Sequence, residues 1–552
     1  MSTHHEHRES ADTVDADEVV RAWLMEDPDP DTRAELEALL AAHDTAGISD
    51  RFGARLEFGT AGLRGEVAAG PNRMNRSVVI SAAAGLAAYL KATVGTGTVV
   101  IGYDARRKSD VFARDTAEVM RGAGHDAVLL PRPLPTPLLA FAIRHLGCVA
   151  GVMVTASHNP PRDNGYKVYL RDGSQIVPPA DADISAQIEA VGPVSNVPRA
   201  DGWTVLDDDI LEAYLDAVAA LPSEGSPRDL TLVYTPLHGV GDETVEKALA
   251  RAGFAAPIVV PQQQQPDADF PTVSFPNPEE PGAMDLAMAL AAEHDADIVV
   301  ANDPDADRCA VAVPALQGWR MLRGDEVGAL LADHLLRRGV RGVFATTIVS
   351  STLLGVMAER HGVEFAETLT GFKWIGRVPG LAFGYEEALG YCVAPDLVRD
   401  KDGVSALLRV AELAAELKAE GRTLLDRLDE IAAEYDVYAT DQLSVRVDDL
   451  SLIDQTMQRL RDTPPTSLGG FAVEQIDDLS AGSASLPPTD GLRYRLAEGG
   501  RVVVRPSGTE PKIKCYLEVV IPVEGGDVQA ARISGAGRLD AIRGDLSAAA
   551  GL

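Results

Sequence analysis

GVMVTASHNPPRDNGYKVYL, residues 151–170, places a single serine between two runs that are typical of β-strands. The apolar run at 151–154 predicts a buried strand that ends at Thr155. The Pro160-Pro161 pair then prevents a helix from continuing that strand. We therefore expect Ser157 on a rigid loop at a strand end, which is where α/β proteins gather their ligands.

Two neighbours could give that serine chemistry. A serine hydroxyl is a poor nucleophile unless a base takes its proton or a metal polarises it, and His158 is adjacent. Asn164-Gly165 predicts a tight turn into a returning strand, on which Lys167 and Tyr169 share one face, so that Lys167 can point toward the serine loop. On this stretch alone, a catalytic site and an ordinary surface loop are equally good interpretations.

A second stretch predicts a cation site. Three aspartates stand at alternate positions directly after a strand predicted at 297–301: Asp303, Asp305 and Asp307. Their carboxylates are the ligands that hard divalent cations prefer. An EF-hand is excluded, because its sixth and twelfth positions require glycine and glutamate and here are Arg308 and Pro314. The apolar run at 309–313 predicts a core strand, which favours a cation site over a merely solvated loop.

Together these stretches resemble the α-D-phosphohexomutase superfamily, with TASHNP at 155–160 as its phosphoserine loop and DPDADR at 303–308 as its magnesium loop. Two further stretches are similar to the family's other signatures, in the expected order. YEEALG at 385–390 resembles the sugar-specificity loop, and RPSGTEPK at 505–512 resembles the phosphate-binding loop. GTAGLRG at 59–65 is similar to a GTxGxRG stretch that lies beside the serine in that family.

The resemblance implies roles for particular residues. Expected catalytic residues are Ser157 as a phosphoserine, Arg64 as a phosphoryl contact, and Lys167, with His158 as the alternative, as general acid and base. Expected Mg²⁺ ligands are Ser157, Asp303, Asp305 and Asp307. Expected substrate-binding residues are Arg308, Lys373, Glu386, Arg505, Ser507, Gly508, Thr509 and Lys512. Two residues keep two interpretations each: Lys373 as a ligand contact or a surface lysine beside Trp374, and His238 as a site residue or a turn histidine.

The resemblance also implies a reaction. The phosphoserine passes its phosphoryl group to a sugar phosphate, a bisphosphosugar reorients, and the serine takes back the other group. We therefore expect a mutase that interconverts hexose 1-phosphate and hexose 6-phosphate (glucose or mannose), with Mg²⁺ and a primer such as glucose 1,6-bisphosphate. The family usually has serine two residues after the sugar-binding glutamate, but here that residue is Ala388.

That departure leaves alternatives open. The form EEALGY resembles most closely the branch with phosphopentomutases and bisphosphosugar-forming enzymes. A phosphopentomutase or a sugar-bisphosphate synthase on the same scaffold is therefore the first alternative. A metal-dependent sugar phosphatase and a non-catalytic sugar-phosphate-binding module are less favoured, because hydrolysis needs no second phosphate site and a binding module needs no serine with an attendant base.

Composition limits the partners. Fifty Lys and Arg against 83 Asp and Glu give a net charge of −33, which disfavours nucleic acid and anionic membranes as partners. The longest apolar run, residues 78–90, is shorter than the ~20 residues of a membrane span, and the N-terminus lacks a signal-peptide core. The four cysteines, 148, 309, 392 and 515, form no CxxC pair. We expect a cytoplasmic monomer or homodimer that acts on small sugar phosphates.

The 552 residues are too many for one core. A strand–helix–strand pattern occurs at 98–130, 230–260 and 342–367, and each helix ends near a glycine. We predict three related α/β domains with mixed sheets and a smaller α+β C-terminal domain, with the active-site cleft between them. The predicted divisions are an N-terminal tail (1–16) and helices (within 17–44) in 1–47, domain I at 48–205, domain II at 206–318, domain III at 319–438 and domain IV at 439–552.

Overall fold

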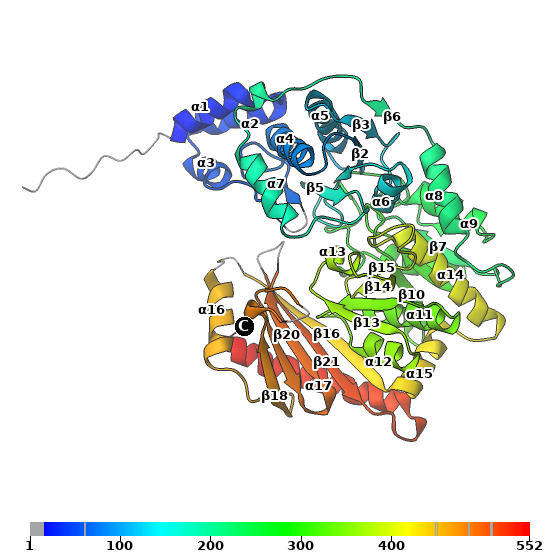
Figure 1. Cartoon of the computed structure of the whole chain (residues 1–552). Helices are drawn as coiled ribbons and strands as arrows, with labels where there is room; N and C mark the ends of the chain where they lie inside the picture. The colour runs from blue at the N-terminus through cyan, green and yellow to red at the C-terminus, as the bar shows by residue number, and fades with distance from the viewer. Residues whose placement is uncertain are drawn as a thin grey trace, which may run out of the picture.

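The protein folds as four sheets in succession along an arc, preceded by three N-terminal helices (Figure 1). The structure is a computed structural model that describes residues 16–59, 62–447, 449, 451–483, 486–507 and 512–551. The N-terminal helices are α1 (Ala16–Glu26), α2 (Pro30–Ala41) and α3 (Thr45–Phe52). The first two confirm the predicted helices, the third was not predicted, and the tail predicted at 1–16 lies outside the described residues up to residue 15.

The first sheet carries the serine loop and has the order β1-β5-β4-β2-β3-β6. Its strands are β1 (Leu63–Glu66), β2 (Thr98–Tyr103), β3 (Asp126–Leu129), β4 (Ala150–Val154), β5 (Asp163–Leu170) and β6 (Thr204–Val205). Its helices are α4 (Arg76–Thr93), α5 (Ser109–Gly122), α6 (Thr136–His145) and α7 (Ala180–Glu189). Strands β2, β3 and β4 are parallel, so the β4 end that leads to Ser157 lies beside the carboxyl end of β2.

One prediction about this sheet is wrong. Asn164 and Gly165 lie inside strand β5 instead of in a turn, because Gly165 pairs with Arg64 of β1. The side chain of Asn164 donates to the main-chain carbonyl of Arg107 and to the hydroxyl of Ser109. Tertiary pairing therefore overrides the local turn preference of the Asn-Gly pair. The chain reverses earlier, between β4 and β5.

The second sheet carries the aspartates and has the order β11-β10-β9-β7-β8. Its strands are β7 (Leu232–Thr235), β8 (Ile258–Val259), β9 (Ile298–Ala301), β10 (Ala310–Ala315) and β11 (Gly318–Met321). Its helices are α8 (Asp209–Ala219), α9 (Asp242–Arg251) and α10 (Asp285–Glu293). The two strands predicted around the aspartates are confirmed as β9 and β10, which pair antiparallel, so the loop between them is a tight connection at the sheet end.

The third sheet carries the sugar loop and has the order β13-β12-β14-β15. Its strands are β12 (Val343–Thr347), β13 (Glu364–Thr368), β14 (Leu381–Glu386) and β15 (Gly390–Cys392). Its helices are α11 (Gly324–Arg337), α12 (Leu353–Arg360), α13 (Phe372–Ile375), α14 (Gly403–Ala419) and α15 (Leu424–Tyr435). All three predicted strand–helix–strand units are confirmed as parallel pairs: β2 with β3, β7 with β8, and β12 with β13.

The fourth sheet is antiparallel, with the order β16-β21-β20-β19-β18-β17. Its strands are β16 (Val437–Arg446), β17 (Ser467–Leu468), β18 (Phe471–Asp478), β19 (Leu492–Leu496), β20 (Arg501–Pro506) and β21 (Lys512–Ile521). Its helices are α16 (Ser451–Asp462) and α17 (Val528–Ala550). Short 3-10 turns occupy Val194–Asn196, Leu479–Ala481, Ala497–Gly499 and Glu524–Gly526. Three mixed sheets and one antiparallel sheet with helices confirm the predicted fold class.

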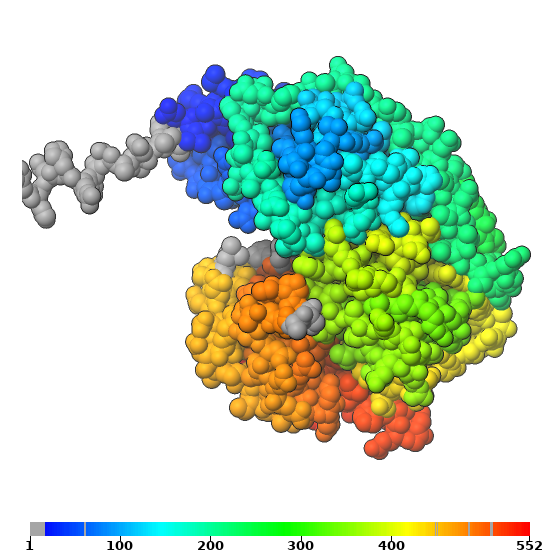
Figure 2. Space-filling model, viewed as in Figure 1, coloured from blue at the N-terminus to red at the C-terminus, as the bar shows by residue number. Residues whose placement is uncertain are grey.

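Figure 2 shows the surface hollowed between the first and fourth domains, at the inner side of the arc. Residues of the serine, aspartate and sugar loops line one cleft, among them Ser157, Arg308 and Glu386. Among the described residues, no helix is both long and apolar enough to cross a membrane.

Candidate active site

The serine loop is buried and locally constrained. Ser157 has a φ of 53°, in the left-handed region that a non-glycine residue rarely adopts, and its side chain is almost fully buried. Its N–H donates to the Oγ1 of Thr155 at 2.8 Å. Its Oγ donates to Oδ2 of Asp303 at 2.7 Å and lies 3.2 Å from Nδ1 of His158. The loop of the first domain thus presents its hydroxyl to the aspartate loop of the second.

Arg106 holds that loop in place, and sequence reasoning missed it. Its Nη2 donates to the carbonyls of Ser157 and Asn159, each at 2.6 Å. Its Nη1 donates to the carbonyls of Pro160 and Asp163, at 2.8 Å and 3.1 Å. Its guanidinium also lies 4.9 Å from the ring centre of Phe270. One buried cation therefore satisfies four carbonyls of the loop, which stabilises the left-handed turn at the serine.

The three aspartates form a buried cluster. Asp303, Asp305 and Asp307 have no exposed surface, and one ligand oxygen from each lies within 4.8 Å of the other two. Burial and the two neighbouring carboxylates raise the pKa of Asp303 well above its usual range. The Oδ1 atoms of Asp305 and Asp307 have no hydrogen-bond partner among the described residues.

These features fit a hard divalent cation. Unpartnered buried carboxylate oxygens are costly, and a cation of the Mg²⁺ type accepts such oxygens as ligands. Thr136, at the start of α6 in the first domain, donates its hydroxyl to Oδ2 of Asp305 at 2.6 Å and orients that carboxylate. The Oγ of Ser157 adjoins the cluster as a further oxygen ligand.

Basic residues from the first and third domains, together with Arg308 of the same loop, compensate the cluster. Nζ of Lys167, on β5, donates to Oδ2 of Asp305 at 2.8 Å and to Oδ2 of Asp307 at 3.0 Å. Nζ of Lys401, in the third domain, lies 2.9 Å from the same oxygen of Asp307. Sequence reasoning missed Lys401, whose partner is distant in the chain. Arg308 adds its Nε at 3.7 Å from Oδ2 of Asp303.

A cleft of about 290 Å³ brings most of the predicted residues together. All four domains line it. The predicted residues on its wall are Arg64, Ser157, His158, Lys167, Arg308, Lys373, Glu386, Arg505, Ser507 and Lys512. The aspartates lie buried behind this wall. Gly508 and Thr509 lie outside the described residues.

The third domain contributes an acid and a base to the cleft. Glu386 is the last residue of β14, and burial raises the pKa of its carboxyl. Lys373 in α13 is 6% exposed, and its Nζ has no hydrogen-bond partner among the described residues. Burial lowers the pKa of Lys373. The Nζ also lies 5.5 Å from the ring centre of Trp374. A buried Nζ that lines a cleft without a hydrogen-bond partner favours the ligand contact over the surface-lysine interpretation.

The fourth domain contributes basic residues from two paired strands. Arg505 of β20 lies opposite Lys514 of β21, and both line the cleft. The N–H of Ser507 donates to the carbonyl of Lys512 at 2.8 Å, which closes the strand pair around the phosphate-binding stretch. Lys514 was not predicted, although its alternation with Lys512 along the strand could have suggested it.

Arg64 and His238 differ in their relation to the cleft. Arg64, on β1, donates from Nη1 to Oδ1 of Asn159 at 3.1 Å and so adjoins the serine loop. His238 lies 2.8 Å from the Oγ1 of Thr272 through its Nε2 and does not line the cleft. Its N–H donates to the carbonyl of Gln263. The contacts of His238 favour the turn-histidine interpretation.

Comparison with known proteins identifies the family. Domains I, II and III of the family described as phosphoglucomutase/phosphomannomutase match residues 55–194, 212–318 and 323–435, and its C-terminal domain matches 443–534. The chain belongs to the phosphoglucomutase/phosphomannomutase family. The enzyme is therefore a phosphomutase, an isomerase that works as an intramolecular phosphotransferase.

Two relatives and one solved structure illustrate the similarity. The chain is 52% identical over 454 residues to the "Probable phosphomannomutase" of Haemophilus influenzae, covering 81% of this chain and 93% of that one. It is 35% identical to the human phosphopentomutase, covering 93% and 92%. A phosphoglucomutase/phosphomannomutase family protein from Burkholderia thailandensis shares the fold with a TM-score of 0.70 at 20% identity, covering 90% of this chain and 98% of that one.

Replacing Asp305 tests the cation site. We expect Asp305→Asn to weaken Mn²⁺ binding by about tenfold or more, because the affinity of an oxygen-ligand site follows the charge of its ligands. Calorimetric titration with Mn²⁺ measures the effect. Asp295→Asn, at an exposed aspartate before β9, is the control and should bind as the wild type does. Equal affinity in both variants would place the cation elsewhere.

Replacing Arg106 tests the support of the serine loop. We expect Arg106→Lys to lower kcat by about 10²-fold with little change in KM, because a single ammonium cannot satisfy four carbonyls and the serine shifts. Mutase assays on the purified variant measure both constants. Arg107→Lys is the control, since Arg107 is 64% exposed and pairs only with Asp269 at the surface. An Arg106 variant with wild-type kcat would show that the loop holds its shape alone.

Proposed function

We propose that this phosphomutase interconverts hexose 1-phosphate and hexose 6-phosphate, with glucose or mannose as the sugar, through a phosphoserine at Ser157 and a bisphosphosugar intermediate. One observation carries the proposal. The same cleft has the serine on one wall, with the carboxylate cluster buried directly behind it, and the basic residues Arg505, Lys512 and Lys514 on another wall. A sugar with a phosphate at each end can contact both walls at once.

The reaction moves a phosphoryl group twice. A hydroxyl oxygen of the sugar phosphate attacks the phosphorus of the phosphoserine, the bond from phosphorus to Oγ of Ser157 breaks, and a bisphosphosugar forms. The bisphosphosugar turns end for end, and Oγ of Ser157 attacks its other phosphorus. The sugar oxygen leaves with a proton, and the positional isomer is released. Such transfers depend mainly on positioning and charge stabilisation, which this cleft supplies.

Two residues could move the protons. Although burial opposes a charge there, Asp305 and Asp307 raise the pKa of Lys167, so its Nζ is held as an ammonium. Burial, together with Arg308 and Arg64, holds the pKa of His158 well below its usual range. In the ammonium form Lys167 can give a proton to the leaving sugar oxygen, and the amine that remains can accept a proton from an attacking hydroxyl. We therefore assign the general acid and base on the sugar hydroxyl to Lys167. His158, neutral and adjacent to Ser157, is the alternative.

Charge compensation favours magnesium in the carboxylate cluster. Ser157, Asp303, Asp305 and Asp307 would hold the cation, which when bound would stabilise the negative charge of the phosphoryl group. A phosphoserine has a charge of about −2 and the three carboxylates add three more negative charges. A divalent cation together with the three basic side chains of Lys167, Arg308 and Lys401 would offset that total.

The sugar is bound in this proposal by the third domain. Glu386 would accept hydrogen bonds from sugar hydroxyls, and Lys373 would contact a phosphate or hydroxyl from the opposite side of the cleft. Arg505, Ser507, Gly508, Thr509 and Lys512 would bind the phosphate that does not react. Arg308 would contact the substrate beside the cation site, and Arg64 would contact the phosphoryl group on the serine. Glucose 1,6-bisphosphate or a similar bisphosphosugar would prime the serine, and the substrates would be free sugar phosphates in the cytoplasm, bound by a monomer or homodimer.

A pentose substrate is the second candidate. Ala388 provides no hydroxyl at a position where the family usually has serine, so one contact to a hexose is missing. The human phosphopentomutase aligns over 93% of this chain. A phosphopentomutase or a sugar-bisphosphate synthase would use the same serine and the same cation site. A phosphatase or a binding module accounts less well for two phosphate-binding walls.

A substrate panel tests the choice of sugar. Turnover of glucose, mannose, N-acetylglucosamine and ribose 1-phosphates is measured with a bisphosphate primer and Mg²⁺. We expect glucose or mannose 1-phosphate to be converted with the highest kcat/KM, and no net release of inorganic phosphate. Fastest conversion of ribose 1-phosphate would establish the pentose alternative. Phosphate released as fast as the sugar phosphate disappears would establish a phosphatase.

Replacing the serine tests the covalent step. We expect Ser157→Ala to abolish isomerisation and to remove the label transferred to the protein from ³²P-labelled glucose 1,6-bisphosphate, because the proposed mechanism passes the phosphoryl through the Oγ of Ser157. The matched variant Ser174→Ala, at a buried serine outside the cleft, should keep both activities. Full mutase activity in Ser157→Ala would remove the serine from the mechanism.

A further inference from the structure

Two adjacent strands of the fourth domain carry three kinds of side-chain pair along one face. Strands β20 and β21 pair antiparallel, and residues two apart on each strand share a face. The pairs are Arg501 with Glu518, Val503 with Tyr516, and Arg505 with Lys514. The apolar middle pair packs in one cluster with Ile348 and Val349 of the third domain. The face therefore has an ion pair at one end, an apolar contact in the middle and the phosphate-binding residues at the other end.

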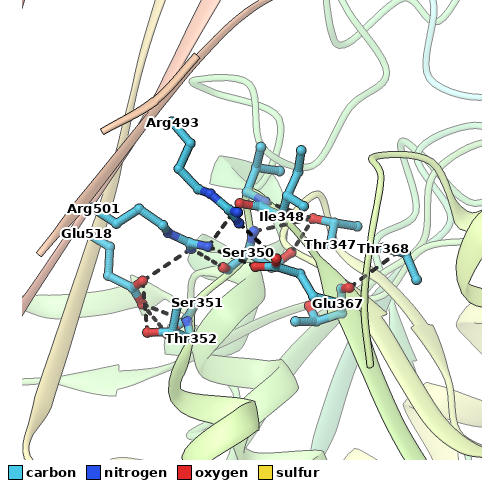
Figure 3. A network of polar contacts seen from close by, with 12 residues as sticks. Thr347, Ile348, Ser350, Ser351, Thr352, Glu367, Thr368, Arg493, Arg501 and Glu518 are labelled. Atoms are coloured by element: carbon cyan, nitrogen blue, oxygen red, sulfur yellow. Dashed lines mark hydrogen bonds and ion pairs between the residues drawn. The ribbon is translucent and has the colours of Figure 1, made fainter. Parts of the chain in front are cut away.

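The arginine of the ion pair binds the third domain directly. Arg501 is 8% exposed. Its Nη1 donates to the carbonyl of Ile348 at 2.9 Å, and its Nη2 donates to the carbonyl of Ser350. The guanidinium lies 3.1 Å from Oε2 of Glu518 (Figure 3). A planar guanidinium can make these contacts at the same time, whereas an ammonium cannot.

The glutamate of the ion pair binds the same loop. Glu518 accepts from the Oγ of Ser351 at 2.6 Å and from the N–H of Thr352 at 2.8 Å. Its other oxygen accepts from the Oγ1 of Thr352 at 3.0 Å. Figure 3 shows both members of the pair directed at residues 347–352, which we call the docking loop and which join β12 to α12. The fourth domain thus contacts this loop of the third through buried charge-assisted bonds, in addition to ion pairs with Glu367 of β13.

The docking loop holds the sugar loop on its other side. The Oγ of Ser350 donates to Oε2 of Glu387 at 2.8 Å and accepts from the N–H of Glu387 at 3.1 Å. The Oγ1 of Thr347 lies 3.3 Å from the same carboxylate oxygen. Glu387 follows Glu386 directly, and both line the cleft. Ser350 is therefore shared: its carbonyl faces the fourth domain and its hydroxyl faces the sugar loop.

We propose that Arg501 is a positioning residue that sets the distance between the phosphate-binding residues of the fourth domain and the sugar loop of the third. The proposal rests on the proposed function, in which one sugar phosphate spans both. Arg501 and Arg505 are four residues apart on a single strand, about 13 Å. An anchor at Arg501 therefore determines where Arg505 and Lys514 lie relative to Glu386. Without it, the substrate's phosphate and its sugar cannot both be bound optimally.

The test compares a ligand that spans both sites with one that does not. In Arg501→Lys, the charge opposite Glu518 remains but the fork to the two carbonyls is lost. We expect the dissociation constants of glucose 6-phosphate and ribose 5-phosphate, measured by calorimetry, to rise about tenfold, which corresponds to ~1.4 kcal/mol. The inhibition or dissociation constant of inorganic phosphate, which has no sugar, should stay within twofold.

Arg493→Lys is the matched control. Arg493 contacts Glu367, which Arg501 also approaches at 3.4 Å, but among the described residues its side chain donates to no carbonyl of the docking loop. We expect its affinities to match the wild type. Equal affinity for the sugar phosphates in wild type and Arg501→Lys, or equal weakening in Arg501→Lys and Arg493→Lys, would overturn the positioning role. An equal loss of affinity for inorganic phosphate and for the sugar phosphates in Arg501→Lys would also overturn it.

A second variant tests the other half of the contact. Ser350→Ala leaves the carbonyl for Arg501 but removes the hydroxyl that holds Glu387. It should weaken the binding of the sugar phosphates but not that of inorganic phosphate. The double variant Arg501→Lys/Ser350→Ala should bind sugar phosphates no more weakly than the single variant with the lower affinity. If the losses of affinity multiply in the double variant, the proposal is overturned. Wild-type affinities in Ser350→Ala would also overturn it, and this measurement can be made even if Arg501→Lys does not fold. Absence of mutase turnover in the wild type would instead overturn the proposed function, since the affinity comparison does not depend on turnover.

Discussion

The structure depends on compensating three carboxylates that are fully removed from water. Burying even one unpaired carboxylate costs several kcal/mol, and Asp305 and Asp307 remain ionised because opposite charges lie beside them and lower their pKa. Those charges come from other domains: Lys167 from the first and Lys401 from the third. Separating the domains would therefore leave buried charge without a partner. The ion pairs that compensate the carboxylate cluster are therefore also contacts between domains, which explains why the cluster lies where three domains meet.

Much of the fold and half of the site could be predicted because the signals are local. An apolar run that ends at a polar loop predicts a strand end, and this placed Ser157 and the three aspartates correctly at the ends of β4 and β9. Arg106 and Lys401 escaped prediction because their partners are distant in the chain: Arg106 binds carbonyls more than 50 residues away, which no spacing indicates. The Asn164-Gly165 turn was predicted wrongly for the converse reason, because a strong local preference yields to strand pairing with β1.

The fourth domain was the hardest to predict in detail. Strand β18 reads FAVEQIDD and has little apolar surface, since its outer face forms ion pairs such as that of Asp477 with Arg493. A half-polar strand of this kind has the composition of a loop, and only its neighbours reveal it. The alternation of β20 and β21 places the docking pair, the apolar pair and the pair proposed to bind phosphate in sequence along one face. Because residues two apart on a strand share a face at a fixed spacing, the position of the interface pair determines how far away the pair at the cleft lies.

A net charge of −33 repels an anionic substrate at long range, but this repulsion does not prevent binding in the cleft. At physiological ionic strength, charges on the exterior are screened beyond about 8 Å, so most of the acidic surface does not act at the cleft. Inside the cleft, polarisability is low and distances are short, so the nearby basic side chains determine the electrostatic potential. These side chains lie on both walls of the cleft. In the proposed mechanism a bisphosphorylated sugar turns round, and it would need positive charge at each end of its path. An acidic exterior disfavours other polyanions without weakening that local attraction, and so adds selectivity for small ligands that can enter.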